Sequence, residues 1–202
     1  MTVGRGKDFE EKETKEILKV LKNTSFDPDD KWGKYKHYTW KNKEEVKISF
    51  GEHLLSYITQ MTYPYGEPIS LCWSKLYGAT SKDRDITPPS GSQRDYYWGV
   101  VGRPSMGLHQ EKWVYGDMEI GKDPLKFWST TLLVTKSDDL EGGEIVLAGD
   151  SIDDLAEFQS RLKVINLKEK GQTASWNGET VHGVAEITKG TRWVLVTFKD
   201  VN

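Results

Sequence analysis

Cysteine is almost absent from this sequence, since Cys72 is the only one among 202 residues. A single thiol cannot form an internal disulfide, and it cannot supply the several sulfur ligands of a structural zinc site or an iron–sulfur cluster. Cys72 lies in the run ISLCWS, whose composition is typical of a buried strand. The sequence therefore excludes a fold held by internal disulfides and every metal centre built on cysteines.

Long apolar runs are also missing. No stretch approaches the roughly 18 apolar residues that a membrane-spanning helix needs. The N-terminus, MTVGRGKDFEEKETKE, has no apolar core of the kind found in secretory signals. We therefore expect a cytoplasmic protein with no membrane partner.

Positive charge is not in excess. The chain carries 28 Lys and Arg against 31 Asp and Glu, which gives a formal net charge of −3. Proteins that bind the phosphate backbone of nucleic acids usually carry a clustered basic excess. Nucleic acid is therefore not expected as a partner.

Two N-terminal segments show the spacing of amphipathic helices. Asp8 and Glu11 have the spacing of a capping box and precede apolar residues at helical intervals, which predicts a helix over residues 9–22. A second box, Ser49 with Glu52, predicts the start of a second helix that ends before the next proline. The apolar face of that helix is formed by Phe50, Leu54, Ile58 and Met61.

The pattern of residue types changes after residue 68. Short runs rich in β-branched and aromatic residues alternate there with turn clusters, which predicts a β-sandwich or β-barrel. The eight runs are ISLCWSKLY, YYWGVV, KFWSTTLLVT, EIVLAG, RLKVINL, QTASW, VHGVAEI and TRWVLVTF. We expect one domain over residues 1–202, with helical support in 1–66 and a β-barrel core in 69–200.

An aromatic patch with interleaved lysines lies between the two predicted helices. Its members are Trp32, Tyr35, Tyr38 and Trp40. Such a patch can bind a partner or pack on the rest of the protein, and we expect packing.

A histidine and a carboxylate two residues apart suggest a metal site. If the segment GLHQEKW is extended, His109 and Glu111 project from the same face of a sheet. His182, in the late strand NGETVHGV, is the candidate third ligand. Two histidines and one carboxylate form the facial arrangement of non-haem iron(II), which leaves open positions for a chelating ligand and dioxygen. The alternatives are a solvated surface strand for the first pair and a packed histidine for His182.

Arg192 follows His182 by ten residues. The Lys189-Gly190 turn between them predicts a hairpin that pairs their two strands. A guanidinium is a rigid fork for a carboxylate, so a buried Arg192 would need an anion such as the far carboxylate of 2-oxoglutarate. The alternative is a surface ion pair with one of the many acidic side chains.

These motifs together resemble the prolyl-4-hydroxylase-like family of 2-oxoglutarate- and iron(II)-dependent dioxygenases. The family pattern is H-x-D/E, then a strand ending in GGE, then H followed by G-x-R-W. The matching pieces are LHQE, STTLLVTKSDDLEGGEIVL and VHGVAEITKGTRWVLVTF. The resemblance covers roughly residues 96–199, and the C-terminal piece is its most specific part.

The resemblance implies a mainly β fold with flanking N-terminal helices, a double-stranded β-helix of the jelly-roll, cupin-like type. It implies that His109, Glu111 and His182 bind Fe(II) and that Arg192 binds 2-oxoglutarate. Tyr97 and Thr131 are implied as further co-substrate contacts, for which ordinary core packing is the alternative. Dioxygen is the second co-substrate, and ascorbate is a candidate reductant.

Three positions depart from patterns within the family. Glu111 stands where most members have Asp, and its extra methylene moves the carboxylate unless the backbone compensates; it also argues against halogenation, for which a small residue is needed there. Leu133 replaces a tyrosine that touches the co-substrate in some relatives. Phe198 stands where relatives that repair alkylated nucleic acid carry a second arginine.

The expected function is hydroxylation of a C–H bond with release of succinate and carbon dioxide. The expected substrate is a prolyl residue in a peptide or protein, or a free amino acid, although the same architecture also serves other small molecules. Two other classes stay open: a non-catalytic barrel that binds 2-oxoglutarate or metal, and a cupin-type metalloenzyme of other chemistry. The sequence indicates no oligomeric state.

Overall fold

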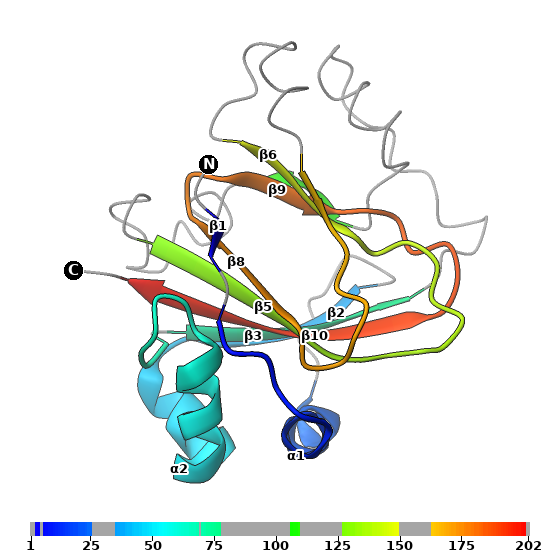
Figure 1. Cartoon of the computed structure of the whole chain (residues 1–202). Helices are drawn as coiled ribbons and strands as arrows, with labels where there is room; N and C mark the ends of the chain where they lie inside the picture. Colours follow the sequence, from blue (N-terminus) through cyan, green and yellow to red (C-terminus); the bar gives the residue numbers. More distant parts are fainter. Residues whose placement is uncertain are drawn as a thin grey trace.

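The computed structural model describes residues 3–4, 6–25, 35–68, 70–77, 106–109, 127–149 and 163–200. They form two α-helices and two antiparallel β-sheets (Figure 1). Neither described helix is long and apolar enough to cross a membrane.

The larger sheet has six strands in the order β1-β8-β5-β10-β3-β2. Their bounds are Val3–Gly4 (β1), Thr173–Asn177 (β8), Phe127–Lys136 (β5), Thr191–Asp200 (β10), Ser70–Tyr77 (β3) and Tyr35–Trp40 (β2). The smaller sheet has the order β4-β9-β6-β7, with bounds Met106–His109, Val181–Val184, Ile145–Gly149 and Lys163–Ile165. Figure 1 shows the smaller sheet facing one side of the larger one.

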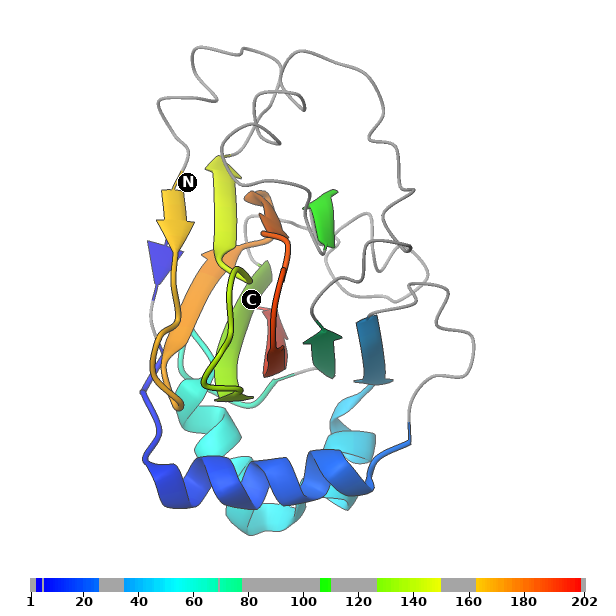
Figure 2. The same ribbon diagram turned by 90° about the vertical axis from the view of Figure 1, so that its right-hand side faces the viewer.

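Both helices cover the other side of the six-stranded sheet (Figure 2). Helix α1 (Glu11–Asn23) and helix α2 (Lys43–Met61) bury Ile17, Leu21 and Ile58 against Leu132, with all four side chains fully inaccessible to solvent. We call this the helix-side core. A second apolar cluster lies between the two sheets and contains Leu133, Ile145, Leu147, Leu167, Ala174, Trp176 and Val194.

The first helix begins later than the capping-box spacing predicts. Asp8 does not cap it, because its carboxylate accepts a hydrogen bond from the Thr173 backbone N–H on β8, at 3.0 Å. The Glu13 carboxylate instead accepts from the Glu10 N–H at 2.8 Å, which satisfies a donor at the start of α1. The helix therefore spans Glu11–Asn23.

The second helix begins at Lys43, six residues before Ser49, which was expected to cap it. Asn42 caps it by accepting a hydrogen bond from the Glu45 N–H at 3.0 Å. Ser49 is not a cap, since its hydroxyl accepts from the Trp40 indole N–H at 2.8 Å. The helix is kinked at Gly51, whose φ of 66° lies in the left-handed region that glycine adopts without strain.

The strand predictions are confirmed wherever the structure describes them. Seven of the eight predicted runs coincide, to within two residues at each end, with or enclose the observed strands β3, β5, β6, β7, β8, β9 and β10, and the run YYWGVV lies outside the described residues. The region expected to be helical support adds β1 and β2 to the larger sheet. Trp40 is 1% exposed and stacks edge-on against Phe50, so the packing role predicted for the aromatic patch is confirmed at this residue.

The predicted hairpin of the strands that carry His182 and Arg192 is wrong. Strand β9 pairs with β4 and β6, whereas β10 pairs with β3 and β5 in the other sheet. The linking residues bond to the segment before β6 instead: Ala185 N–H donates to Glu144, Thr188 N–H to Glu141, and Glu141 N–H to Lys189. The chain thus crosses from one sheet to the other between the two residues.

Candidate active site

His182 lies in the middle of the smaller sheet with one ring nitrogen already engaged. Its side chain is 4% exposed, and Nδ1 lies 2.9 Å from the Thr180 carbonyl oxygen. A carbonyl oxygen can only accept, so Nδ1 donates in this contact. Metal-binding histidines are commonly oriented by such a contact to a backbone carbonyl. His182 is therefore held by the kind of contact that orients a histidine to bind a metal through Nε2.

A tight turn before β9 holds the Thr180 carbonyl in place. The Thr180 N–H donates to the Asn177 backbone oxygen at 3.0 Å, and its hydroxyl donates to the Asn177 side-chain oxygen at 2.5 Å. Both residues are buried. The NGET segment thus closes on itself between β8 and β9 and fixes the acceptor of the His182 ring.

His109 lies directly opposite His182. It ends β4, and the antiparallel register of β4 and β9 pairs the two residues. Opposed residues in an antiparallel pair have Cβ atoms roughly 4.5–5.5 Å apart. The extended conformation expected for His109 is confirmed, and the two positions are neighbours.

The third predicted ligand, Glu111, lies outside the described residues, as does Tyr97. Within the described part of the chain, no group of three or more His, Cys, Asp and Glu side chains is placed to hold a metal ion. The complete ligand set therefore stays a prediction, and its described part is the His109–His182 pair.

Arg192 lies on the face of the larger sheet that is turned toward the smaller one. Along β10, Trp193 and Leu195 pack on the helix-side core, whereas Val194 and Val196 pack between the sheets. Side chains alternate along a strand, so Arg192 belongs to the inner set. It is 4% exposed, which contradicts the alternative of a solvated surface ion pair.

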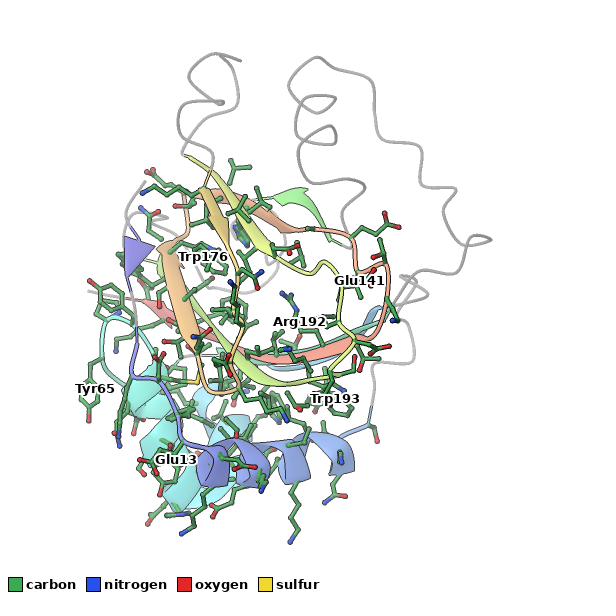
Figure 3. The ribbon with its side chains drawn as sticks, turned by 45° about the vertical axis from the view of Figure 1, so that its right-hand side comes forward. Glu13, Tyr65, Glu141, Trp176, Arg192 and Trp193 are labelled. Carbon is green, nitrogen blue, oxygen red and sulfur yellow. The ribbon has the colours of Figure 1, made fainter. Side chains whose placement is uncertain are left out.

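The guanidinium of Arg192 is bound by the glycine pair before β6. Its Nη1 donates a hydrogen bond to the Gly143 carbonyl oxygen. Gly142 and Gly143 have φ angles of 84° and 83°, which other residues rarely adopt, so the pair forms a turn that glycine makes without strain. The turn also has a second role, because its carbonyl steers Arg192 from across the two sheets. Figure 3 shows Arg192 pointing into the space between them.

Thr131 also belongs to the inner face. It is 4% exposed on β5 and lies two residues from Leu133, which packs between the sheets. Its register partners are Ala174 on β8 and Val196 on β10. The structure therefore brings Thr131 to the same sheet face as Arg192, and a co-substrate contact stays a prediction.

Three features of this region were not assigned from sequence. The Thr180 and Gly143 carbonyls act through the backbone, so no side chain signals them. Trp176, on β8, lies with its ring centroid 4.8 Å from that of His182. A tryptophan within a strand is usually a core residue. The only sequence signal for Trp176 is the NGE turn that follows it, which indicates that its strand is followed directly by the strand of His182.

Comparison with known proteins supports this arrangement at the level of fold. No protein-family model matches the sequence, and no curated protein matches it significantly. An oxidoreductase of the 2OG-Fe(II) oxygenase family from Burkholderia pseudomallei has 11% identity and a TM-score of 0.55, with 96% of this chain and 82% of that one covered. A Pseudomonas putida prolyl-4-hydroxylase has 9% identity and a TM-score of 0.52, with coverage of 99% and 92%. AviO1 from Streptomyces viridochromogenes has 11% identity and a TM-score of 0.53, with coverage of 98% and 89%.

The chain therefore has the fold of the 2-oxoglutarate- and iron(II)-dependent oxygenases. The resemblance to the prolyl-4-hydroxylase-like members, which the sequence motifs indicate, is confirmed for the fold, mainly antiparallel β with two helices.

Proposed function

We propose that the protein is a 2-oxoglutarate- and iron(II)-dependent dioxygenase that hydroxylates a C–H bond and releases succinate and carbon dioxide. The proposed substrate is a prolyl residue in a peptide or protein, or a free amino acid. Residues 1–202 form one domain, and the two sheets are the walls of a double-stranded β-helix. His109, Glu111 and His182 are the proposed iron ligands.

One observation carries the proposal: a buried histidine and a buried arginine face the same space from opposite sheets. His182 lies opposite Leu147, which packs between the sheets, and its ring contacts Trp176 of the other sheet. Arg192 enters that space from β10. A metal ligand and a carboxylate fork on facing walls suit a small anion that chelates the metal with its other end.

The donor set fits iron(II). Two imidazoles and one carboxylate occupy one face of the metal and leave three positions for other ligands. When bound there, iron(II) with 2-oxoglutarate supplies the activation of dioxygen and the oxidation of the substrate. The Thr180 carbonyl orients the His182 ring to bind a metal through Nε2.

The remaining residues of the site bind 2-oxoglutarate and exclude water. Arg192 holds the far carboxylate of 2-oxoglutarate, with Gly143 orienting the guanidinium. Thr131 contacts the co-substrate from β5. Leu133 and Val194 line the same face with apolar surface, which keeps water from the reacting groups.

The test is an anaerobic titration with iron(II) and 2-oxoglutarate, monitored by the weak visible charge-transfer band of the chelate. We expect the band in the unaltered protein and its loss in Glu111→Ala. A band with succinate release supports the oxygenase. A band without succinate release in a substrate screen indicates the non-catalytic binding barrel, and no band at all favours the cupin-type alternative.

Replacing Arg192 with lysine is expected to weaken 2-oxoglutarate binding by about 10- to 100-fold. The charge stays, but the planar fork that bonds a carboxylate through two N–H groups is lost. Iron(II) affinity should hardly change, because the residue does not bind the metal. Lys189→Ala is the matched control, since it removes an exposed positive charge three residues away. Unchanged 2-oxoglutarate affinity in Arg192→Lys would contradict the assignment.

A further inference from the structure

Trp176 carries a buried hydrogen-bond donor that none of the described residues uses. Its side chain is 3% exposed, and its indole Nε1 has no hydrogen-bond acceptor within the described part of the chain. Buried donors of folded proteins are nearly always paired, because an unpaired one loses its bond to water without replacement. An acceptor from outside the described part of the chain is therefore expected at this point.

The position of Trp176 indicates where that acceptor lies. The residue is on β8, on the face that packs between the sheets, and its ring lies against the His182 ring at 4.8 Å, tilted by 49°. Nδ1 of His182 is bound to the Thr180 carbonyl, so a metal would be bound through Nε2. The indole thus lies beside the proposed metal ligand His182.

Trp176 and Arg192 lie toward opposite ends of one sheet face. Trp176 pairs with Ser129 on β5, and Ser129 pairs with Phe198 on β10. Phe198 is six residues beyond Arg192 on the same strand, a backbone distance of roughly 20 Å at about 3.3 Å per residue. Both side chains extend into the space between the sheets, so they approach a ligand there from different ends.

We propose that the indole N–H of Trp176 donates a hydrogen bond to the metal-bound end of 2-oxoglutarate, to an oxygen of its oxo-carboxylate group. This inference rests on the proposed function. Arg192 grips the distal carboxylate, and Trp176 fixes the reacting end beside His182. A carboxylate acceptor makes this bond charge-assisted, and an indole offers a donor that cannot also accept.

The first test compares Trp176→Phe with Trp128→Phe by the anaerobic iron(II) and 2-oxoglutarate titration. Phenylalanine keeps a packed ring and removes the N–H. Trp128 is a matched control, since it is 9% exposed on the neighbouring strand β5 and packs on Tyr63, away from His182. We expect 2-oxoglutarate to bind about 10- to 100-fold more weakly to Trp176→Phe, the range of one hydrogen bond to a charged acceptor, with iron(II) affinity unchanged. The control should match the unaltered protein.

A shorter ligand tests which end Trp176 contacts. 2-Oxobutyrate keeps the oxo-carboxylate group and lacks the distal carboxylate. The weakening caused by Trp176→Phe should persist with this ligand, whereas the weakening caused by Arg192→Lys should disappear. If the effect of Trp176→Phe disappears with 2-oxobutyrate instead, the proposed contact is at the wrong end and the inference fails.

A direct readout comes from the indole N–H itself. The eight tryptophans can be labelled with nitrogen-15, and Zn(II) can replace iron(II) because it is diamagnetic. Trp176→Phe removes one indole signal and so identifies it. That signal should move downfield when 2-oxoglutarate is added, while the Trp128 signal stays in place.

Failure of this inference is distinguishable from failure of the proposed function. A charge-transfer band in the unaltered protein, together with equal 2-oxoglutarate affinity in Trp176→Phe, overturns the role of Trp176 and leaves the oxygenase intact. A missing band in the unaltered protein overturns both. A Trp176 indole signal that does not shift when 2-oxoglutarate is added also overturns the inference, since the donor would then bond to water or to another part of the chain.

Discussion

A His182→Ala protein is expected to fold, yet to lose the charge-transfer band and at least about 100-fold of both iron(II) affinity and succinate release. Loss of a group that merely orients a metal ligand typically costs 10- to 100-fold, so loss of the ligand itself should cost no less. Folding should persist because the ring packs between two sheets whose backbone pairing does not depend on it.

The matched control for this variant is His53→Ala. His53 is a histidine on α2 whose side chain is 67% exposed and lies 3.3 Å from Glu16, on the far side of the larger sheet from the candidate site. It should bind iron(II) and 2-oxoglutarate like the unaltered protein. Thermal unfolding of both variants separates chemistry from stability. A band that survives in His182→Ala would remove this residue from the metal site.

Leu132→Ala is expected to lower the free energy of unfolding by about 2–5 kcal/mol. Leu132 is fully buried on β5, where it joins the helices to the sheet, so truncation leaves a cavity that rigid neighbours on several elements cannot all fill. Urea unfolding measures the change. Ile48→Ala, on α2, is the control, because a side chain that is 76% exposed should change stability by less than about 0.5 kcal/mol.

The Leu132 variant also separates the two faces of β5. The side chain points to the helices, whereas Thr131 and Leu133 point between the sheets. The fraction that remains folded should therefore bind iron(II) and 2-oxoglutarate normally. A variant that unfolds no more easily than the unaltered protein would contradict the helix-side core as a main source of stability.

The strands were predictable where a run is rich in β-branched and aromatic residues and its side chains alternate between two faces. The run KFWSTTLLVT covers nearly all of β5, and the alternation of side chains along the strand places Leu132 and Leu133 in different clusters. Helix starts were less predictable, because several polar residues compete for each role. Asp8 has the right spacing for a cap, but the N-terminal segment lies against β8 and its carboxylate is used there.

The site was predictable to the extent that it depends on residue type and spacing. His182 and Arg192 were singled out because few residue types can bind a metal or fork a carboxylate, and both lie buried between the sheets. Their relation was not predicted, since a glycine turn between two strands usually makes a hairpin. Here the six residues between β9 and β10 cross to the facing sheet, because they form hydrogen bonds with residues 141–144, which are distant in sequence. Such pairing cannot be read from local sequence.

The first residues of the chain bear on how the protein behaves at high concentration. Strand β1 lies along the outer edge of β8, and the Gly6 carbonyl and the Asp8 carboxylate add bonds to Thr173. An open strand edge is a template for pairing with a second molecule. A version shortened by its first eight residues should therefore expose β8 and self-associate, so purification tags are better placed at the other terminus.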